Sequence, residues 1–101
     1  MKARTHWTFL SNHSHVLIAL AKEPDLRIRD LAMAVGITER AVAQIIVDLQ
    51  AAHVLKKRRI GRRNRYVVDA SAPLRHAVEA HRTVADILVL AEQPPPEKKR
   101  R

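Results

Sequence analysis

The hydrophobic periodicity of the chain changes once, after His53, and this change limits the folds that the sequence can adopt. Before it, apolar residues recur at the three- and four-residue spacing that is typical of amphipathic helices. After it, residues 54–70 are rich in β-branched, aromatic and long basic side chains around Gly61, which predicts a β-hairpin with its tip near that glycine. A chain of 101 residues has the length of one domain, so we expect a mostly α fold of the α+β class with one small hairpin.

Three helices are predicted before the hairpin, and each has a start or stop signal. The first covers about residues 12–22 behind a polar capping residue, and the second covers about residues 30–35 and ends at Gly36. The third begins after Thr38 and extends to about residue 52. The residues expected on the buried faces of these helices are Val16, Leu17, Leu20, Ala21, Leu31, Ala32, Val35, Val42, Ile45, Ile46 and Leu49.

The net charge of +9 is concentrated in two segments. Seven of the eleven residues from 56 to 66 are lysine or arginine, and the final stretch, PPPEKKRR, is also strongly basic. The rest of the chain is nearly neutral. Positive charge gathered in this way indicates a binding site for a polyanion, because a surface that serves only solubility scatters both signs.

Residues 28–47, IRDLAMAVGITERAVAQIIV, resemble a DNA-binding helix-turn-helix. Gly36 takes the turn position, where a positive φ is easiest for glycine, and Ala32 is the small residue that lets the two helices approach closely. The apolar residues that match the packing around such a turn are Leu31, Val35, Ile37, Val42 and Ile45.

With the basic hairpin that follows, the resemblance extends to the winged helix-turn-helix, and to small prokaryotic transcription regulators of the MarR and ArsR type. It covers roughly residues 10–70, although the cysteine motifs of the metal-sensing members are missing. The organisation that it implies is an N-terminal arm (1–10), a winged helix-turn-helix domain (11–70), a C-terminal dimerisation helix (71–92) and a disordered basic tail (93–101).

In this reading the outward face of the third helix enters the major groove, where base edges can be distinguished. Arg40 can donate two hydrogen bonds to guanine, and Gln44 can pair with adenine in a similar way. Val47 suits a thymine methyl group, and Thr38 with the helix N-terminus can hold a phosphate. Glu39 is expected to stabilise the helix dipole rather than to read a base. The alternative is that Arg40 and Gln44 are ordinary solvated residues.

The hairpin is the second predicted DNA contact, because guanidinium groups pair with phosphate in a bidentate way and also enter narrow minor grooves. A charged sheet edge can instead serve only to prevent aggregation, although one or two charges suffice for that. The predicted contact residues of this wing are Lys56, Lys57, Arg58, Arg59, Arg62, Arg63, Asn64 and Arg65.

A fourth helix is predicted over about residues 73–91, and three prolines follow it. Because terminal helices commonly build a twofold dimer in the family resembled, this helix is expected to form a homodimer interface. The alternative is that it folds back over the core of its own chain. The residues expected at or near the interface are Leu74, Val78, His81, Val84, Ile87, Leu88 and Leu90. The basic tail either adds non-specific attraction to DNA or is inert.

The favoured function is therefore that of a sequence-specific transcription regulator that binds double-stranded DNA. The main alternative is an architectural or nucleoid protein of the same fold with little sequence preference, since only two strong candidate base readers are present. A protein- or RNA-interaction module is a third hypothesis.

The sequence shows no catalytic, metal-binding or membrane-spanning pattern. It has no glycine-rich phosphate loop, nucleophile elbow or paired carboxylates, so no enzymatic activity is predicted. With no cysteine and six histidines at diverging spacings, no metal or other cofactor is expected, and no small-molecule effector is indicated. The apolar runs are too short to cross a bilayer and no secretory signal is visible, so a cytoplasmic location is expected.

Overall fold

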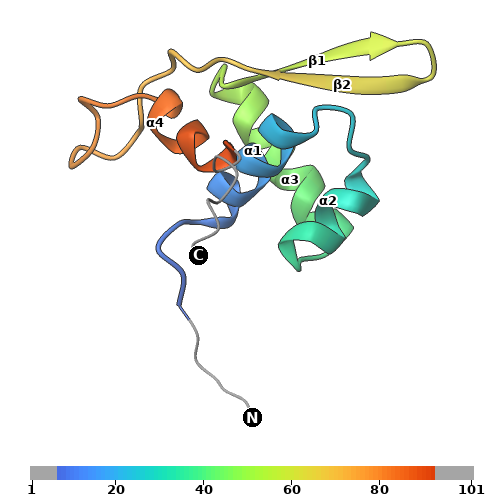
Figure 1. The fold of residues 1–101 in the computed structure, drawn as a ribbon, viewed down its shortest axis with the longest axis horizontal. Coiled ribbons are helices and arrows are strands. Elements are labelled where there is room, and N and C mark those ends of the chain that lie inside the picture. The colour runs from blue at the N-terminus through green and yellow to red at the C-terminus, as the bar shows by residue number, and fades with distance from the viewer. Residues whose placement is uncertain (1–6, 93–101) are drawn as a thin grey trace, which may run out of the picture.

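The helical half of the chain folds into three helices that pack against one another, α1 (Asn12–Lys22), α2 (Ile28–Val35) and α3 (Glu39–Ala51). The remaining elements are an antiparallel hairpin of β1 (Leu55–Ile60) and β2 (Arg63–Val68), the short helix α4 (Val84–Leu88) and a 3-10 helix, η1 (Val89–Ala91). This computed structural model describes residues 7–92, and its arrangement is shown in Figure 1. The α+β class predicted from the sequence is confirmed for these residues.

Each of the first three helices begins with a local hydrogen bond between a side-chain oxygen and a backbone N–H group, in the first turn of α1 and α3 and at the capping residue of α2. Ser11 Oγ accepts from the N–H of Ser14 at 3.4 Å, and Thr38 Oγ1 accepts from the N–H of Ala41 at 3.0 Å. α2 begins at Ile28, two residues earlier than expected, because Asp30 acts from inside the first turn: its carboxylate accepts from the N–H of Arg27 at 3.3 Å.

α2 ends at Gly36, as predicted, in a left-handed conformation with φ at 84°. The N–H groups of Gly36 and Ile37 both donate to the carbonyl of Ala32, at 2.8 and 3.1 Å, and this tight turn leads directly into the cap of α3. Glycine suits this position because a side chain would be strained at a positive φ.

The core lies between the three helices and the base of the hairpin. Val16, Leu20, Leu31 and Val42 are its most deeply buried large side chains. The predicted stripe of α3 is confirmed, whereas Ala21, expected on the buried face of α1, is exposed. The buried core residues are Val16, Leu17, Leu20, Leu31, Ala32, Val42, Ile45, Ile46, Leu49, Val54, Leu55, Tyr66 and Val84.

The hairpin turns through a two-residue loop, Gly61–Arg62, with Ile60 paired to Arg63. Gly61 has φ at 61°, which is the left-handed value that such tight loops require at their first position. The tip therefore lies at the predicted glycine, and Asn64, one of the predicted contact residues of the wing, is a strand residue opposite Arg59.

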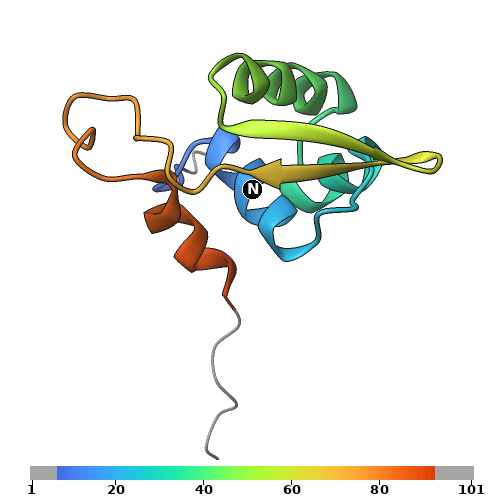
Figure 2. The ribbon, with the colours of Figure 1, turned by 90° about the horizontal axis from the view of Figure 1, so that it is seen from above.

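Only the base of the hairpin is packed. Leu55 and Tyr66 are buried, whereas every other residue of β1 is exposed. Figures 1 and 2 show the two strands running along the helices with the tip projecting beyond them.

The predicted helix over residues 73–91 is wrong in its first half. Residues 71–83 form an irregular loop, in which Asp69 Oδ1 accepts from both the backbone N–H and the hydroxyl of Ser71. The helix begins only after Thr83, whose own N–H donates to Asp86 Oδ2 at 3.1 Å. The sequence contains a signal for this start, because Thr83 and Asp86 have the Thr-x-x-Asp spacing of a helix cap. This local cap determines the start of the helix more strongly than the apolar residues before it.

The expected dimer residues divide into two groups. Val84 is 3% exposed in the core of its own chain, and Leu74 and Leu88 pack against the same core. This corrects the placement of Val84 at an interface and supports the alternative that the segment folds back. Val78 and Leu90 are 76% and 55% exposed, and His81 is also exposed.

The two ends of the chain lie partly outside the residues that the structure describes. Residues 7–10 of the expected N-terminal arm include Trp7 and Phe9, whose rings meet edge to face at 4.9 Å between centroids. The expected disordered tail, residues 93–101, lies outside the described residues. Within residues 7–92, none of the helices has the length and apolar character needed to cross a membrane.

Candidate nucleic-acid interface

The predicted recognition face of α3 is a row of exposed side chains along a 13-residue helix. Arg40, Gln44 and Val47 follow one another at four- and three-residue spacing, so they lie on the same side, opposite the buried stripe. Val47 is 55% exposed on this side of the helix. Thr38 and Glu39 are exposed at the N-terminal end of this row.

Arg40 and Gln44 differ in their surroundings. Arg40 forms no ion pair with any residue of the described part of the chain. Gln44 is engaged, because its amide nitrogen donates to Asp48 Oδ1 at 2.9 Å. An ionised carboxylate only accepts hydrogen bonds, so this contact fixes which end of the amide faces Asp48 and leaves the Gln44 oxygen available to another donor.

Asp48 connects this row to α1. His13 Nε2 lies 2.9 Å from Asp48 Oδ2, while Gln44 occupies Oδ1. The hydrogen bond with His13, and then that from Gln44, hold the pKa of Asp48 below its usual value. Asp48 was not predicted from the sequence, although its four-residue spacing from Gln44 was a signal for this contact.

The basic side chains of the hairpin are all exposed and divide between its two faces. Lys57, Arg59 and Asn64 share the face of the buried Tyr66, whereas Arg58, Arg63 and Arg65 share the opposite face. Arg58 lies directly across the ladder from Arg65, an arrangement of like charges that destabilises a sheet unless an anion lies nearby.

Asp25, in the loop between α1 and α2, supplies part of that negative charge. Its carboxylate lies 3.2 Å from Arg65 Nε, and its backbone carbonyl accepts from Arg63 at 2.9 Å. The same loop receives a backbone hydrogen bond from Tyr66 N–H to the carbonyl of Pro24 at 3.2 Å. These contacts hold β2 against the helical body. Asp25 was not singled out from the sequence, because only the fold brings residue 25 next to residue 65.

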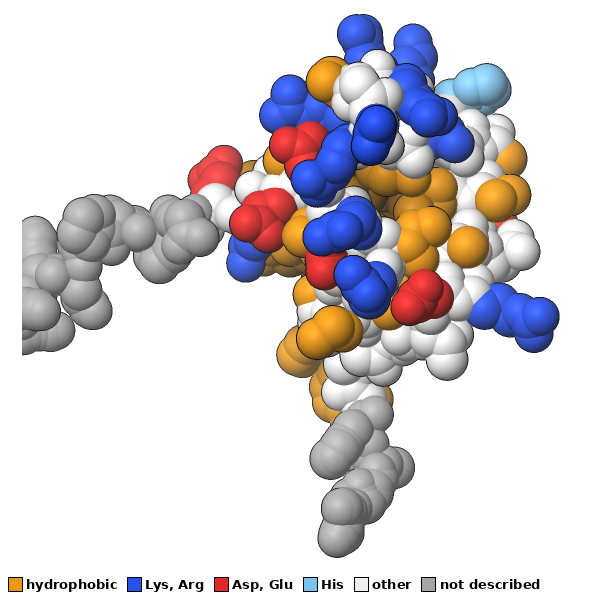
Figure 3. Space-filling view, turned by 90° about the vertical axis from the view of Figure 1, so that its right-hand side faces the viewer, with side chains coloured by type: hydrophobic (Ala, Val, Ile, Leu, Met, Phe, Trp, Pro, Cys, Tyr) orange, Lys and Arg blue, Asp and Glu red, His pale blue; other side chains and the backbone are white. Residues whose placement is uncertain are grey.

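The hairpin and α3 are brought together by the short connection between them, and β1 contacts α3. In Figures 1 and 2 the N-terminal end of α3 and the tip of the hairpin lie toward the same end of the molecule. Figure 3 faces that end: Lys and Arg side chains run from the hairpin at the top to the middle of the face, beside a patch of hydrophobic side chains.

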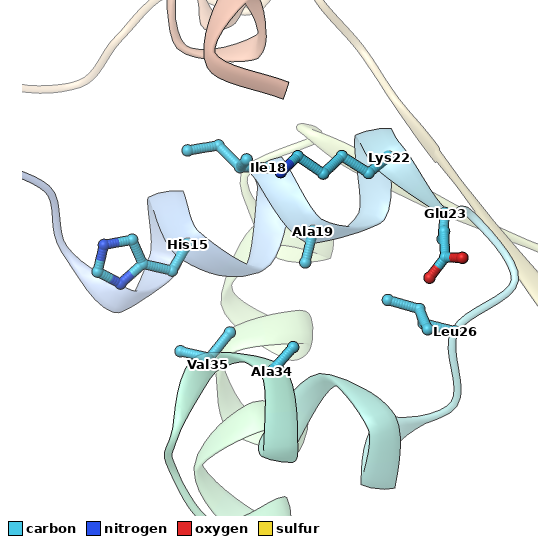
Figure 4. Close-up of a pocket in the computed structure, with 8 residues that line it drawn as sticks. All are labelled: His15, Ile18, Ala19, Lys22, Glu23, Leu26, Ala34 and Val35. Carbon is cyan, nitrogen blue, oxygen red and sulfur yellow. The ribbon is translucent and has the colours of Figure 1, made fainter. Parts of the chain in front are cut away.

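A pocket between α1 and α2 lies apart from this basic surface. It has a volume of about 440 Å³ and is lined mainly by apolar side chains, with His15, Lys22 and Glu23 among them (Figure 4). No polar or charged residue is buried anywhere in residues 7–92, and the polar residues that line this pocket are partly or fully exposed. In the same range, no group of three His, Asp or Glu side chains is placed to hold a metal ion.

The described residues thus present an exposed surface rich in lysine and arginine. A scan against protein-family models found no match for this sequence, and a search of curated proteins returned no significant match.

Proposed function

We propose that this protein is a sequence-specific transcription regulator that binds double-stranded DNA as a winged helix-turn-helix, with α3 in the major groove and the basic hairpin on phosphates or in the adjacent minor groove. The observation that carries the proposal is the capped α3, with Arg40, Gln44 and Val47 exposed in one row, next to a projecting hairpin that contains seven lysines and arginines.

The dimensions of the two elements suit a duplex. A helix of 13 residues is about 20 Å long, and an α-helix fits the major groove, which is about 12 Å wide. The order of three helices followed by a hairpin is the one expected from the resemblance to MarR- and ArsR-type regulators. Because the ligand would be chromosomal DNA, the proposal places the protein in the cytoplasm of a prokaryotic cell.

Salt dependence tests the electrostatic half of the proposal. If about 6–10 phosphates are neutralised per complex, the affinity for a duplex falls roughly 10³–10⁵-fold between about 50 and 200 mM salt. Fluorescence anisotropy with a labelled duplex measures this slope. A nearly flat dependence would contradict the assignment of the hairpin to phosphates.

Substitution of Arg62 and Arg63 by alanine tests whether the hairpin faces DNA. Both side chains are exposed near the tip, and because Arg63 also donates to the carbonyl of Asp25, circular dichroism checks that the double variant retains the fold while it loses two charges. We expect a large loss of DNA affinity and a smaller salt slope. Unchanged affinity would assign the hairpin to another partner, such as a protein or RNA.

Selection of bound duplexes from a random pool tests the sequence-specific half. One observation favours the alternative of an architectural protein: the amide nitrogen of Gln44 is already bonded to Asp48, whereas Arg40 forms no ion pair with any described residue. Arg40 is then the stronger of the two candidate base readers. An enriched motif with guanine opposite Arg40 supports the regulator. A pool without any enriched motif supports the architectural protein.

A homodimer forms part of the proposal, with a reduced interface. The expected residues that are not in the core of their own chain are Val78, His81, Ile87 and Leu90. A dimer would read two half-sites about one helical turn apart, so the selected motif would be palindromic. Light scattering of the full chain measures the mass, and a strict monomer would remove the dimer and the palindrome together.

A further inference from the structure

A small depression lies between the tip of the hairpin and the start of α2. Its volume is about 160 Å³, and its polar lining consists of Arg27, Arg62, Arg63 and Asn64. The remaining lining is mainly apolar, from Leu26, Ile28 and Tyr66. Three arginines, one before α2 and two at the hairpin tip 35 or more positions later in the sequence, therefore line one depression.

The charges of these arginines are incompletely balanced. Arg63 donates to a backbone carbonyl, that of Asp25, at 2.9 Å, and this neutral partner leaves its charge in place. The carboxylate of Asp25 lies instead against Arg65. Within residues 7–92, Arg62 forms no ion pair, and Arg27 has one long contact, from its Nε to Asp30 Oδ2 at 3.6 Å. Positive charge thus exceeds negative charge around the depression.

The chemistry of the lining suits an oxyanion. Guanidinium groups present two parallel N–H donors that match the oxygens of a phosphate, and the amide of Asn64 adds a neutral donor. No lining residue carries a carboxylate, so nothing within the lining repels an anion. An anion in this position would also reduce the repulsion among the three arginines.

We propose that Arg27, Arg62, Arg63 and Asn64 form a binding site for one backbone phosphate of the DNA duplex. This inference rests on the proposed function and adds to it a contact from α2, through Arg27, that the sequence analysis did not assign. Phosphate contacts fix the register of a protein on its duplex, so a phosphate held between α2 and the hairpin tip sets the position of the hairpin relative to α3 on DNA.

The closing experiment compares two variants that remove the same charge from the same helix. Arg27→Ala removes a lining residue, whereas Arg29→Ala removes an exposed arginine that lines none of the described pockets. The side chain of Arg27 is 62% exposed, so both variants are expected to fold, and circular dichroism checks this. Affinity for a labelled duplex is measured in the full chain across a range of salt concentrations.

We expect Arg27→Ala to lose roughly tenfold in affinity and to reduce the salt slope by about 0.9, the value for one phosphate contact. Arg29→Ala should lose less than about threefold, through long-range attraction alone. Arg27→Lys should fall between wild type and Arg27→Ala, since it keeps the charge and loses the paired donors. Equal losses for the alanine variants at positions 27 and 29 would overturn the phosphate site.

A titration with inorganic phosphate, followed by NMR, separates this site from the proposed function. In wild type we expect shifts of the Nε–H signals of Arg27, Arg62 and Arg63 and of the side-chain amide of Asn64. In Arg27→Ala the remaining signals, those of Arg62, Arg63 and Asn64, should not shift. If these signals shift but no duplex binds, the DNA-binding proposal is wrong, and the site cannot then be a contact to the DNA backbone. If duplexes bind equally to the two alanine variants while phosphate shifts the signals, the site takes free anions, and the inference alone is wrong.

Discussion

Substitution of Val84 by alanine tests whether the C-terminal segment is part of the core. Val84 is the first residue of α4, is 3% exposed and lies in the core formed by the three-helix body. The change removes two buried methyl groups at about 0.8 kcal/mol each, and the cavity that remains adds a further cost. We therefore expect the free energy of unfolding to fall by about 2–3 kcal/mol, a large fraction of the roughly 5–15 kcal/mol that is typical of a domain.

The chain supplies a matched control in Val89, which is 56% exposed in η1 and is not among the residues of the proposed dimer interface. Val89→Ala removes the same atoms from a solvated position, so it should change stability by less than about 0.5 kcal/mol. Urea denaturation followed by circular dichroism measures both variants. The Val84→Ala protein should show a lower urea midpoint with an unchanged slope, because the surface exposed on unfolding stays nearly the same.

Two results would refute this reasoning. Equal midpoints for the two variants would mean that α4 does not pack on the core. A loss for Val84→Ala that grows or shrinks with protein concentration would place Val84 between chains, since only an intermolecular contact makes stability depend on concentration.

Three further predictions concern local features of the fold. Thr38→Ala removes the acceptor for the N–H of Ala41 and should lower the free energy of unfolding, measured by urea denaturation, by about 1 kcal/mol. Thr38→Ser keeps a hydroxyl acceptor and should be nearly as stable as wild type. The hydrogen bonds from His13 and Gln44 lower the pKa of Asp48 below 3.8 in the folded protein, so its carboxylate adds stability at higher pH that is lost as the pH falls through the folded-state pKa. The urea midpoint of Asp48→Asn should therefore fall less steeply toward acid pH than that of wild type. Parallel pH curves for the two proteins would contradict this. Gly61→Ala should destabilise the hairpin by about 1 kcal/mol because φ is 61° at this position, and Gly61→Asn should destabilise it less. Hydrogen exchange of the hairpin amides measures this stability. Equal protection in wild type and both variants would contradict a strained turn.

The local elements were predictable because their signals lie within a few residues of one another. The bounds of α1, the end of α2 at Gly36 and the cap of α3 at Thr38 each depend on one turn of backbone, and the structure confirms them. The hairpin tip at Gly61 was predictable for the same reason, since it depends on the residues of one tight turn. The error at residues 73–83 arose where a periodic apolar pattern competed with a capping pair, Thr83 and Asp86, and the hydrogen bonds of that pair prevailed.

The contacts that connect the candidate interface were not predictable, because they join distant parts of the chain. His13 meets Asp48, and Asp25 meets Arg63 and Arg65, only after the helices have packed and β2 has been placed beside the loop that follows α1. A single sequence carries no distance information for exposed polar pairs of this kind.

The sequence by itself determined the helix stripes, the caps, the turn glycines and the concentration of positive charge, because backbone preferences and hydrophobic periodicity act over one or two turns. Only the tertiary structure decided that Val84 belongs to the core of its own chain and that Arg27 shares a depression with Arg62 and Arg63. These placements follow from the packing of the whole core, where many weak apolar contacts act together and local propensity has little influence.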